Sequence, residues 1–150
     1  MAADHRREID EQSGLRAWLG AALGVKMARP GELVVCAVGD GAYMFGGPTP
    51  FHYTARRYNL PVLTIVFNNG KWGGVQRSTQ GMYPDEIRQW NEAPFIDLTE
   101  PPDYGMLCRA CGGEAFRAGN EDELVDCLTR ARETVSGGGQ ALIDLSIDSV

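Results

Sequence analysis

Two short polar sequences carry the side chains best suited to chemistry in this chain. Gly39-Asp40-Gly41 follows the apolar run 33–38, and Asn68-Asn69-Gly70 follows a second apolar run at 62–67. Asp and Asn offer hard oxygen atoms, which suit Mg²⁺ or Ca²⁺. The glycines beside Asp40 let the backbone approach a bulky anion, and N–H groups exposed there can bind phosphate. Together these sequences predict a metal-bridged diphosphate site.

Both apolar runs have the length and boundaries of buried strands. A short continuous apolar run is typical of a strand that is covered on both faces in a parallel sheet. The chain alternates such strands with helical segments, which predicts an α/β fold of three layers around a mainly parallel sheet. We expect strands at 33–38, 62–67, 115–117 and 141–145, and helices at 15–28, 49–58, 72–82, 104–111 and 121–135.

The fold class determines where the two polar sequences should lie. Parallel strands end at one edge of the sheet, and ligands bind at that edge, so Asp40 and Asn68-Asn69 are expected side by side. Each sequence alone also has a structural explanation, because Asp40 could cap a helix and Asn68-Asn69-Gly70 could form a tight turn. A dinucleotide loop fits poorly, since Met44 stands where its third glycine is needed. No P-loop sequence occurs.

Length and charge restrict the class of protein. The 150 residues are enough for one domain, and the net charge of −6 argues against a general nucleic-acid or anionic-membrane partner. The charged segment 1–12 contains no apolar stretch, so it is not a secretory signal, and no apolar run could span a membrane. We expect a cytoplasmic protein with a domain at 13–150. The Pro-rich segment 83–104 is expected to be a long surface loop.

The four cysteines allow three interpretations. Cys108 and Cys111 form a C-x-x-C sequence, but neither Cys36 nor Cys127 belongs to the second close pair that a zinc site needs. Thioredoxin-like motifs lie where a strand meets a helix, whereas this sequence lies near the end of a predicted helix. Burial of small side chains is the interpretation we favour.

The order of these motifs resembles the signature of thiamine diphosphate-dependent enzymes. Gly39-Asp40-Gly41 followed by Asn68-Asn69 is the centre of the resemblance, which extends over roughly 13–147. Several segments are similar to acetolactate synthases, benzoylformate decarboxylases and benzaldehyde lyases. These segments are Ser13-Gly14-Leu15, 21–26, 28–30, 58–62, 103–113 and 141–144. The resemblance is specific to the family and much less specific to one reaction.

The resemblance implies roles for individual residues. Asp40 and Asn69 would be Mg²⁺ ligands through their side chains, and Lys71 through its backbone carbonyl. Leu15 would support the bent shape of the cofactor, and plain core packing is the alternative to this role. The residues that would contact the diphosphate or line its pocket are Gly39, Gly41, Ala42, Trp72 and Gly73.

Several features depart from the family pattern. The segment 45–48 is an apparent insertion, and Arg16 and Trp18 stand where relatives often have small or apolar residues. The resemblance covers only the last of the three domains of such enzymes, without its first strand. No segment resembles the pyrimidine-binding domain, whose glutamate protonates the cofactor, so we expect no turnover by this chain alone.

These observations imply one function and leave others open. The resemblance implies a thiamine diphosphate and Mg²⁺-binding domain of a 2-oxoacid decarboxylase or carboligase, similar to acetolactate synthase. The alternatives are a non-catalytic remnant or accessory subunit, and one chain of a two-subunit enzyme whose pyrimidine domain is separate. We expect a homodimer or higher oligomer, because in this family the cofactor lies between two subunits.

Overall fold

The computed structural model describes residues 17–83 and 96–147, and a parallel sheet forms its centre. The strands are β1 (Val35–Gly39), β2 (Leu63–Asn68), β3 (Glu114–Ala118) and β4 (Ala141–Ser146), in the spatial order β1-β2-β4-β3. All neighbouring strands in the described residues pair in parallel. Each consecutive pair is connected through at least one helix, as parallel pairing requires.

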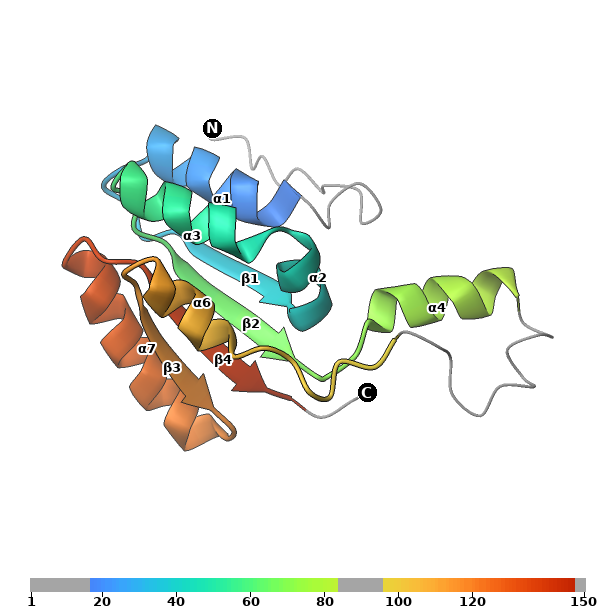
Figure 1. Cartoon of the computed structure of the whole chain (residues 1–150). Helices are drawn as coiled ribbons and strands as arrows, with labels where there is room; N and C mark the ends of the chain where they lie inside the picture. The colour runs from blue at the N-terminus through green and yellow to red at the C-terminus, as the bar shows by residue number, and fades with distance from the viewer. Residues whose placement is uncertain (1–16, 84–95, 148–150) are drawn as a thin grey trace, which may run out of the picture.

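Helices cover the sheet from both sides (Figure 1). One layer contains α1 (Ala17–Ala28), α3 (Pro48–Arg57) and α6 (Tyr104–Ala110), and the short α2 (Asp40–Phe45) follows β1 directly. The opposite layer contains α7 (Glu121–Ser136). The three-layer α/β/α architecture and the parallel sheet are therefore confirmed.

Side chains of the sheet alternate between two cores, one for each layer of helices. Val62 and Val66 point into the core shared with α1, α3 and α6, whereas Leu63 points into the core shared with α7. Ile143 and Leu142 divide in the same way between the two cores. This period of two follows from the pleat of the strands.

The prediction that the first strand is buried on both faces is wrong. Along β1 buried and exposed residues alternate, and the Val35 side chain is 47% exposed. β1 is the outermost described strand beside β2, and α7 packs on β2, β3 and β4. The outward face of β1 therefore has no cover among the described residues, although its continuous apolar sequence predicted one.

The other elements agree with the sequence to within one or two residues. Asn120 caps α7 as predicted, with its side-chain oxygen accepting a hydrogen bond from the Glu123 N–H at 2.9 Å. The separate helix α2 was not predicted, because Gly39, Gly41 and Gly46 suggested a loop. Predictions for 1–16 and most of the loop 83–104 fall outside the described residues.

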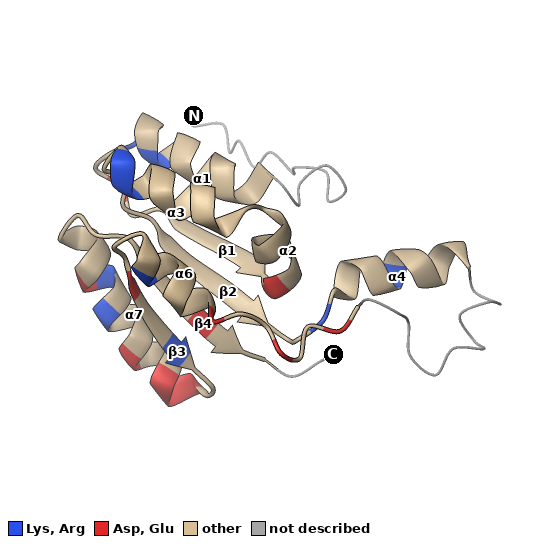
Figure 2. Ribbon diagram, viewed as in Figure 1, with Lys and Arg blue, Asp and Glu red and all other residues tan. Residues whose placement is uncertain are grey.

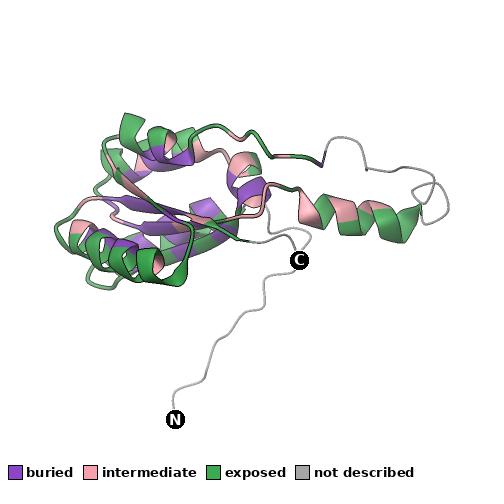
Figure 3. Cartoon of the chain, turned by 90° about the horizontal axis from the view of Figure 1, so that it is seen from below, coloured by how far each residue is buried: buried purple, intermediate pink, exposed green. Residues whose placement is uncertain are grey.

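α4 (Gly73–Met82) differs from the other helices because none of its residues is buried. It extends away from the sheet in both views (Figures 1 and 3). No helix in 17–83 or 96–147 is long and apolar enough to cross a membrane. Acidic and basic residues are mixed along α7, as Figure 2 shows, which agrees with a solvated outer surface.

Candidate functional site

The carboxyl ends of β1 and β2 bring the two polar sequences together. Gly39 pairs with Phe67 in the sheet register, so the residues after each strand leave the same edge. The contact is direct, because Oδ2 of Asp40 accepts a hydrogen bond from the Gly70 N–H at 2.8 Å. The predicted juxtaposition is therefore present in the fold.

Asp40 is a buried carboxylate without a cationic partner among the described residues. Asp40 is only 2% exposed, and its Oδ1 accepts a hydrogen bond from the Gly41 N–H at 2.8 Å. No Lys or Arg within the described ranges forms an ion pair with it. Burying a carboxylate costs several kcal/mol unless charge or hydrogen bonds compensate. A bound cation would supply the missing charge.

The two asparagines point to different partners. Asn68 turns toward the sheet, where its Nδ2 donates a hydrogen bond to Oδ1 of Asp144 at 3.0 Å. Asn69 lies beyond the strand, and its Oδ1 accepts from the Lys71 N–H at 3.1 Å. Asn69 also lines the cleft described below, whereas Asn68 does not. The geometry thus separates a sheet-facing asparagine from a cleft-facing one.

The backbone N–H and C=O groups of Lys71 point away from the segment around Asp97 that lies beside it. Lys71 pairs with Asp97 in an isolated antiparallel bridge. Both hydrogen bonds of this bridge come from flanking residues, with the Trp72 N–H donating to the Ile96 carbonyl and the Leu98 N–H to the Gly70 carbonyl. In such a pair the N–H and C=O of the central residue point away from the partner. Its carbonyl is therefore available as a ligand.

A cleft of about 300 Å³ opens between these segments. Its lining includes all eight of the described residues that the sequence implicated: Gly39, Asp40, Gly41, Ala42, Asn69, Lys71, Trp72 and Gly73. Leu15, the ninth, lies outside the described residues. The cleft also includes five residues that sequence analysis missed: Phe67, Gly74, Val75, Arg77 and Ile147. Arg77 was detectable in principle, since it follows Gly73 by one helical turn.

Trp72 forms one wall of the cleft and explains the need for Gly41. A Cβ added at Gly41 would lie 2.8 Å from the Trp72 ring, closer than real contacts allow. The Trp72 ring also meets the edge of Phe45, with ring centroids 6.3 Å apart. A Cβ at Gly39 would meet nothing within 4 Å, so that glycine faces open space. The two glycines therefore serve different purposes.

The structural explanations for the two motifs account for only part of this geometry. Asp40 does not cap α2 from outside, because Gly39 is the N-cap and no side chain caps the helix. The turn explanation is partly correct, since Asn68 Oδ1 accepts from the Gly70 N–H at 3.2 Å and Gly70 has a φ of +67°. Neither explanation requires Asp40, Asn69 and Lys71 to line one cleft.

The cysteines take no part in a described metal cluster. No group of three or more His, Cys, Asp or Glu side chains suited to a metal occurs among residues 17–83 and 96–147. Cys108 is fully buried, and burial raises the pKa of its thiol to about 12. Cys111 is partly exposed at the end of α6. Burial is therefore the interpretation that the structure favours for Cys108.

The fold and the cleft define a class of protein that comparison with known families identifies. Residues 15–145 match the family described as "Thiamine pyrophosphate enzyme, C-terminal TPP binding domain". Because this match covers most of the chain, the protein belongs to that family.

The relatives include acetolactate synthase large subunits and a 2-hydroxyacyl-CoA lyase. The chain is 33% identical over 130 residues to the acetolactate synthase isozyme 3 large subunit of Escherichia coli, covering 87% of this chain and 21% of that protein. It is 34% identical over 137 residues to a 2-hydroxyacyl-CoA lyase of Oryza sativa, with the same two coverages. The chain thus spans about a fifth of these relatives.

Solved structures show the same fold. A thiamine diphosphate-dependent 4-hydroxybenzoylformate decarboxylase of Rhodococcus jostii superposes with a TM-score of 0.72 at 23% identity, over 93% of this chain and 24% of that one. Benzoylformate decarboxylase from Polynucleobacter necessarius gives 0.65 at 26% identity, over 89% and 23%. The resemblance inferred from the motifs is thereby confirmed at the level of family and fold.

Proposed function

We propose that this chain binds the diphosphate of thiamine diphosphate and its Mg²⁺ in the cleft at the ends of β1 and β2. The observation that carries the proposal is Asp40, a buried carboxylate with only N–H partners among the described residues. The Asn69 side chain and the Lys71 carbonyl complete a set of three oxygen ligands on the same cleft. Two phosphate oxygens and water suit the remaining positions of an octahedron.

The diphosphate is proposed to lie against backbone N–H groups. The first N–H groups of a helix have no partner within it, and α4 begins at Gly73 on the cleft. Ala42, in the first turn of α2, has the same property. Gly39 leaves room for a bulky group, and the positive side chains of Lys71 and Arg77 suit an anion.

The reaction class that we propose is decarboxylation of a 2-oxoacid or its coupling to a carbonyl compound. Thiamine diphosphate supplies the electron sink for such chemistry when it is bound. The names of the relatives, which include acetolactate synthase and benzoylformate decarboxylase, support this class. In this proposal the chain binds and orients the cofactor, and Leu15 supports its bent form.

We propose that catalysis needs a second component. The sequence contains no segment that resembles the pyrimidine domain or supplies its glutamate, so we expect no turnover by the 150 residues alone. A separate subunit carrying that domain would supply the glutamate, whereas a second copy of these 150 residues would not; either partner would cover exposed apolar side chains such as Val35 and Phe67. Light scattering tests the oligomer, and a monodisperse monomer would count against it.

Calorimetry of the whole chain with thiamine diphosphate and Mg²⁺ tests the binding site. We expect binding that requires both components and disappears in Asp40→Ala. The matched control is Asp126→Ala, because Asp126 is an exposed aspartate on α7 whose only described partner is Arg130. The control should bind as the wild type does.

The outcomes separate the proposed function from its alternative. Binding that survives in Asp40→Ala would refute the proposed ligand set. No binding by the wild type at millimolar cofactor would favour a non-catalytic accessory protein that keeps the fold. Robust decarboxylation of a 2-oxoacid by the purified chain would contradict the requirement for a second component.

A further inference from the structure

A buried chain of hydrogen bonds connects α2 with α3 and with the start of β4. The Tyr43 hydroxyl lies 2.8 Å from Nε2 of His52, and Nδ1 of His52 lies 2.7 Å from Oε1 of Gln140. Tyr43 and His52 are completely buried, and Gln140 is 6% exposed. His52 and Gln140 are 88 positions apart in the sequence. None of the three lines the proposed cofactor cleft.

The direction of every hydrogen bond in this chain follows from Gln140. Its amide nitrogen donates to the backbone carbonyls of His52 and Cys111, at 3.0 and 3.2 Å. Oε1 is therefore the atom that faces His52, and Nδ1 of His52 must carry the proton. The unprotonated Nε2 then accepts the Tyr43 hydroxyl proton. All three side chains are satisfied only in this arrangement.

The neutral form of His52 agrees with its surroundings. Burial lowers the pKa of His52 below its ordinary value of 6.5, although the hydrogen bond with Gln140 acts in the opposite direction. Burial also disfavours the charged form of Tyr43 and so raises its pKa, which keeps the hydroxyl proton available for donation.

The position of Tyr43 connects this chain of hydrogen bonds to the cofactor cleft. α2 has only six residues, and Asp40 and Tyr43 are three residues apart, so both lie on its buried face. The helix has no side-chain cap. Rotation of α2 would therefore move the Asp40 carboxylate and the Ala42 N–H together. Of the side chains of this helix, that of Tyr43 is the most deeply buried.

We propose that Tyr43, His52 and Gln140 form a positioning network that fixes the rotation of α2 and thereby sets the affinity for thiamine diphosphate and Mg²⁺. The network rests on the function proposed above and adds residues outside the cleft to it. A hydrophobic contact at these positions would allow α2 to slide or rotate, whereas a directional hydrogen bond from Tyr43 to a His52 ring that Gln140 holds in place specifies one orientation.

Tyr43→Phe is the most direct test, because it removes only the hydroxyl. The ring contacts with Tyr104 and His52, whose centroids lie 5.3 and 5.9 Å from that of Tyr43, can remain. We expect the dissociation constant for thiamine diphosphate with Mg²⁺ to rise about tenfold, as is typical when a group that orients a ligand is lost. Without cofactor, the backbone amide signals of Gly41 and Ala42 should shift in NMR spectra.

Val135→Ala is the matched control for a loss of stability without loss of positioning. Val135 is also buried, at 5% exposed, but belongs to the core shared with α7 on the opposite face of the sheet. This variant should leave the cofactor affinity within about twofold and the two amide signals in place. An equal rise of the dissociation constant in both variants would overturn the proposal, because affinity would then follow overall stability.

Two substitutions at His52 distinguish hydrogen bonding from packing. His52→Gln keeps one donor and one acceptor on its amide, so affinity should stay within about threefold of the wild type. His52→Leu removes both and should behave as Tyr43→Phe does. If Tyr43→Phe does not fold, the difference in cofactor affinity between these two variants still tests the network.

The cofactor-free measurements separate this inference from the proposed function. Nitrogen NMR at about pH 7 should show His52 protonated at Nδ1 alone. Protonation at Nε2, or unchanged Gly41 and Ala42 amides in Tyr43→Phe, would refute the network. If the wild type binds no cofactor, the proposed function fails, and the amide signals still show whether the network positions α2.

Discussion

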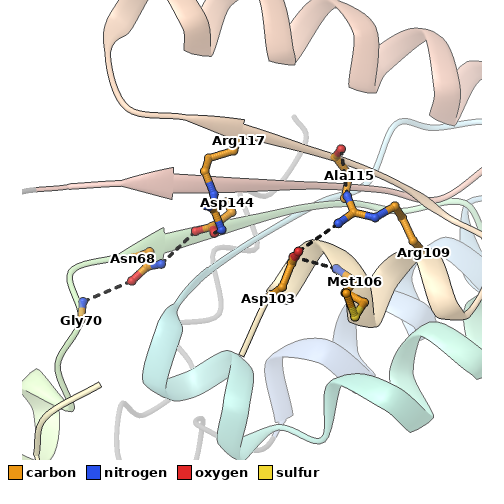
Figure 4. A network of polar contacts seen from close by, with 8 residues as sticks. All are labelled: Asn68, Gly70, Asp103, Met106, Arg109, Ala115, Arg117 and Asp144. Carbon is orange, nitrogen blue, oxygen red and sulfur yellow. Dashed lines mark hydrogen bonds and ion pairs between the residues drawn. The ribbon is translucent and has the colours of Figure 1, made fainter. Parts of the chain in front are cut away.

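Two buried aspartates toward the carboxyl ends of the strands have opposite environments. Asp40 follows β1 and is 2% exposed, and Asp144 lies in β4 and is 4% exposed. Asp144 accepts hydrogen bonds from Arg117 at 3.2 Å and Asn68 at 3.0 Å (Figure 4). Asp40 accepts only from backbone N–H groups in the described part of the chain. The same side chain thus has a cationic partner in one place and none among the described residues in the other.

The difference shows how a structural carboxylate can be told from a ligand. The cavity beside Asp144, of about 250 Å³, contains two aspartates and two arginines that form ion pairs, Arg117 with Asp144 and Arg109 with Asp103. A carboxylate that has an internal cation has little charge left for a metal. Asp40 has no such partner among the described residues and lines a cleft together with Asn69 and Lys71, an oxygen-rich setting of the kind that a cation site requires.

The largest difference in cofactor affinity is expected between alanine substitutions at the two aspartates. Asp40→Ala should weaken binding of thiamine diphosphate with Mg²⁺ by about 100-fold or more, because a ligand loss should exceed the loss of a supporting group. Asp144→Ala should change affinity little and lower the free energy of unfolding by roughly 1–3 kcal/mol, because Asn68 loses its acceptor. Calorimetry and urea denaturation measure the two quantities. Equal effects on affinity would remove the distinction between the two aspartates.

The neighbouring asparagines sharpen the same comparison. Asn69→Ala should weaken cofactor binding by about 10- to 100-fold, since it removes a proposed metal ligand. Asn68→Ala should mainly reduce stability, because its amide bonds to Asp144 inside the sheet. Titration of Mg²⁺ at saturating thiamine diphosphate measures the difference. A larger affinity loss in Asn68→Ala would reverse the proposed roles.

The two glycines beside Asp40 should respond differently to a methyl group. Gly41→Ala forces the Trp72 ring to move, so the apo protein should lose roughly 1–3 kcal/mol of stability and change its tryptophan fluorescence. Gly39→Ala meets open space and should leave the apo protein within about 0.5–1 kcal/mol of the wild type. It should still weaken cofactor binding, because the methyl group enters the cleft. Normal affinity in Gly39→Ala would mean that the cofactor does not approach there.

The smallest effect concerns the dependence of stability on pH. Because burial lowers the pKa of His52 in the folded state, the unfolded chain takes up a proton first as the pH falls below 6.5. Stability should therefore decrease on acidification, by up to about 1.4 kcal/mol per pH unit until the folded His52 also titrates. Burial raises the pKa values of Tyr43, Tyr104 and Cys108, so these neighbours stay protonated throughout.

Urea denaturation of the wild type and His52→Gln at several pH values checks this expectation. The difference between the two proteins isolates His52, because His5 is present in both. The variant should have the flatter profile between about pH 5 and pH 7. Parallel profiles would mean that the folded His52 titrates normally.

The sequence predicted the strands and most helices because their apolar periodicity and their Gly and Pro boundaries are local signals. It also placed Asp40 and Asn69 at one sheet edge, since parallel strands must end together. The cover over β1 was predicted wrongly, because an apolar run indicates that a strand tends to form but does not show where the strand lies in the sheet. α2 was missed because glycines at both ends of a six-residue helix outweigh its short helical pattern.

The sequence by itself determined the family, the order of elements and the polar residues that follow each strand. Only the tertiary structure decided which carboxylate has a cationic partner, because Arg117 and Asn68 reach Asp144 from other strands. It also decided that His52 meets Gln140, 88 residues away. Spacing along a chain cannot show such pairings, since they depend on how the strands align and on which side chains packing brings within hydrogen-bond distance.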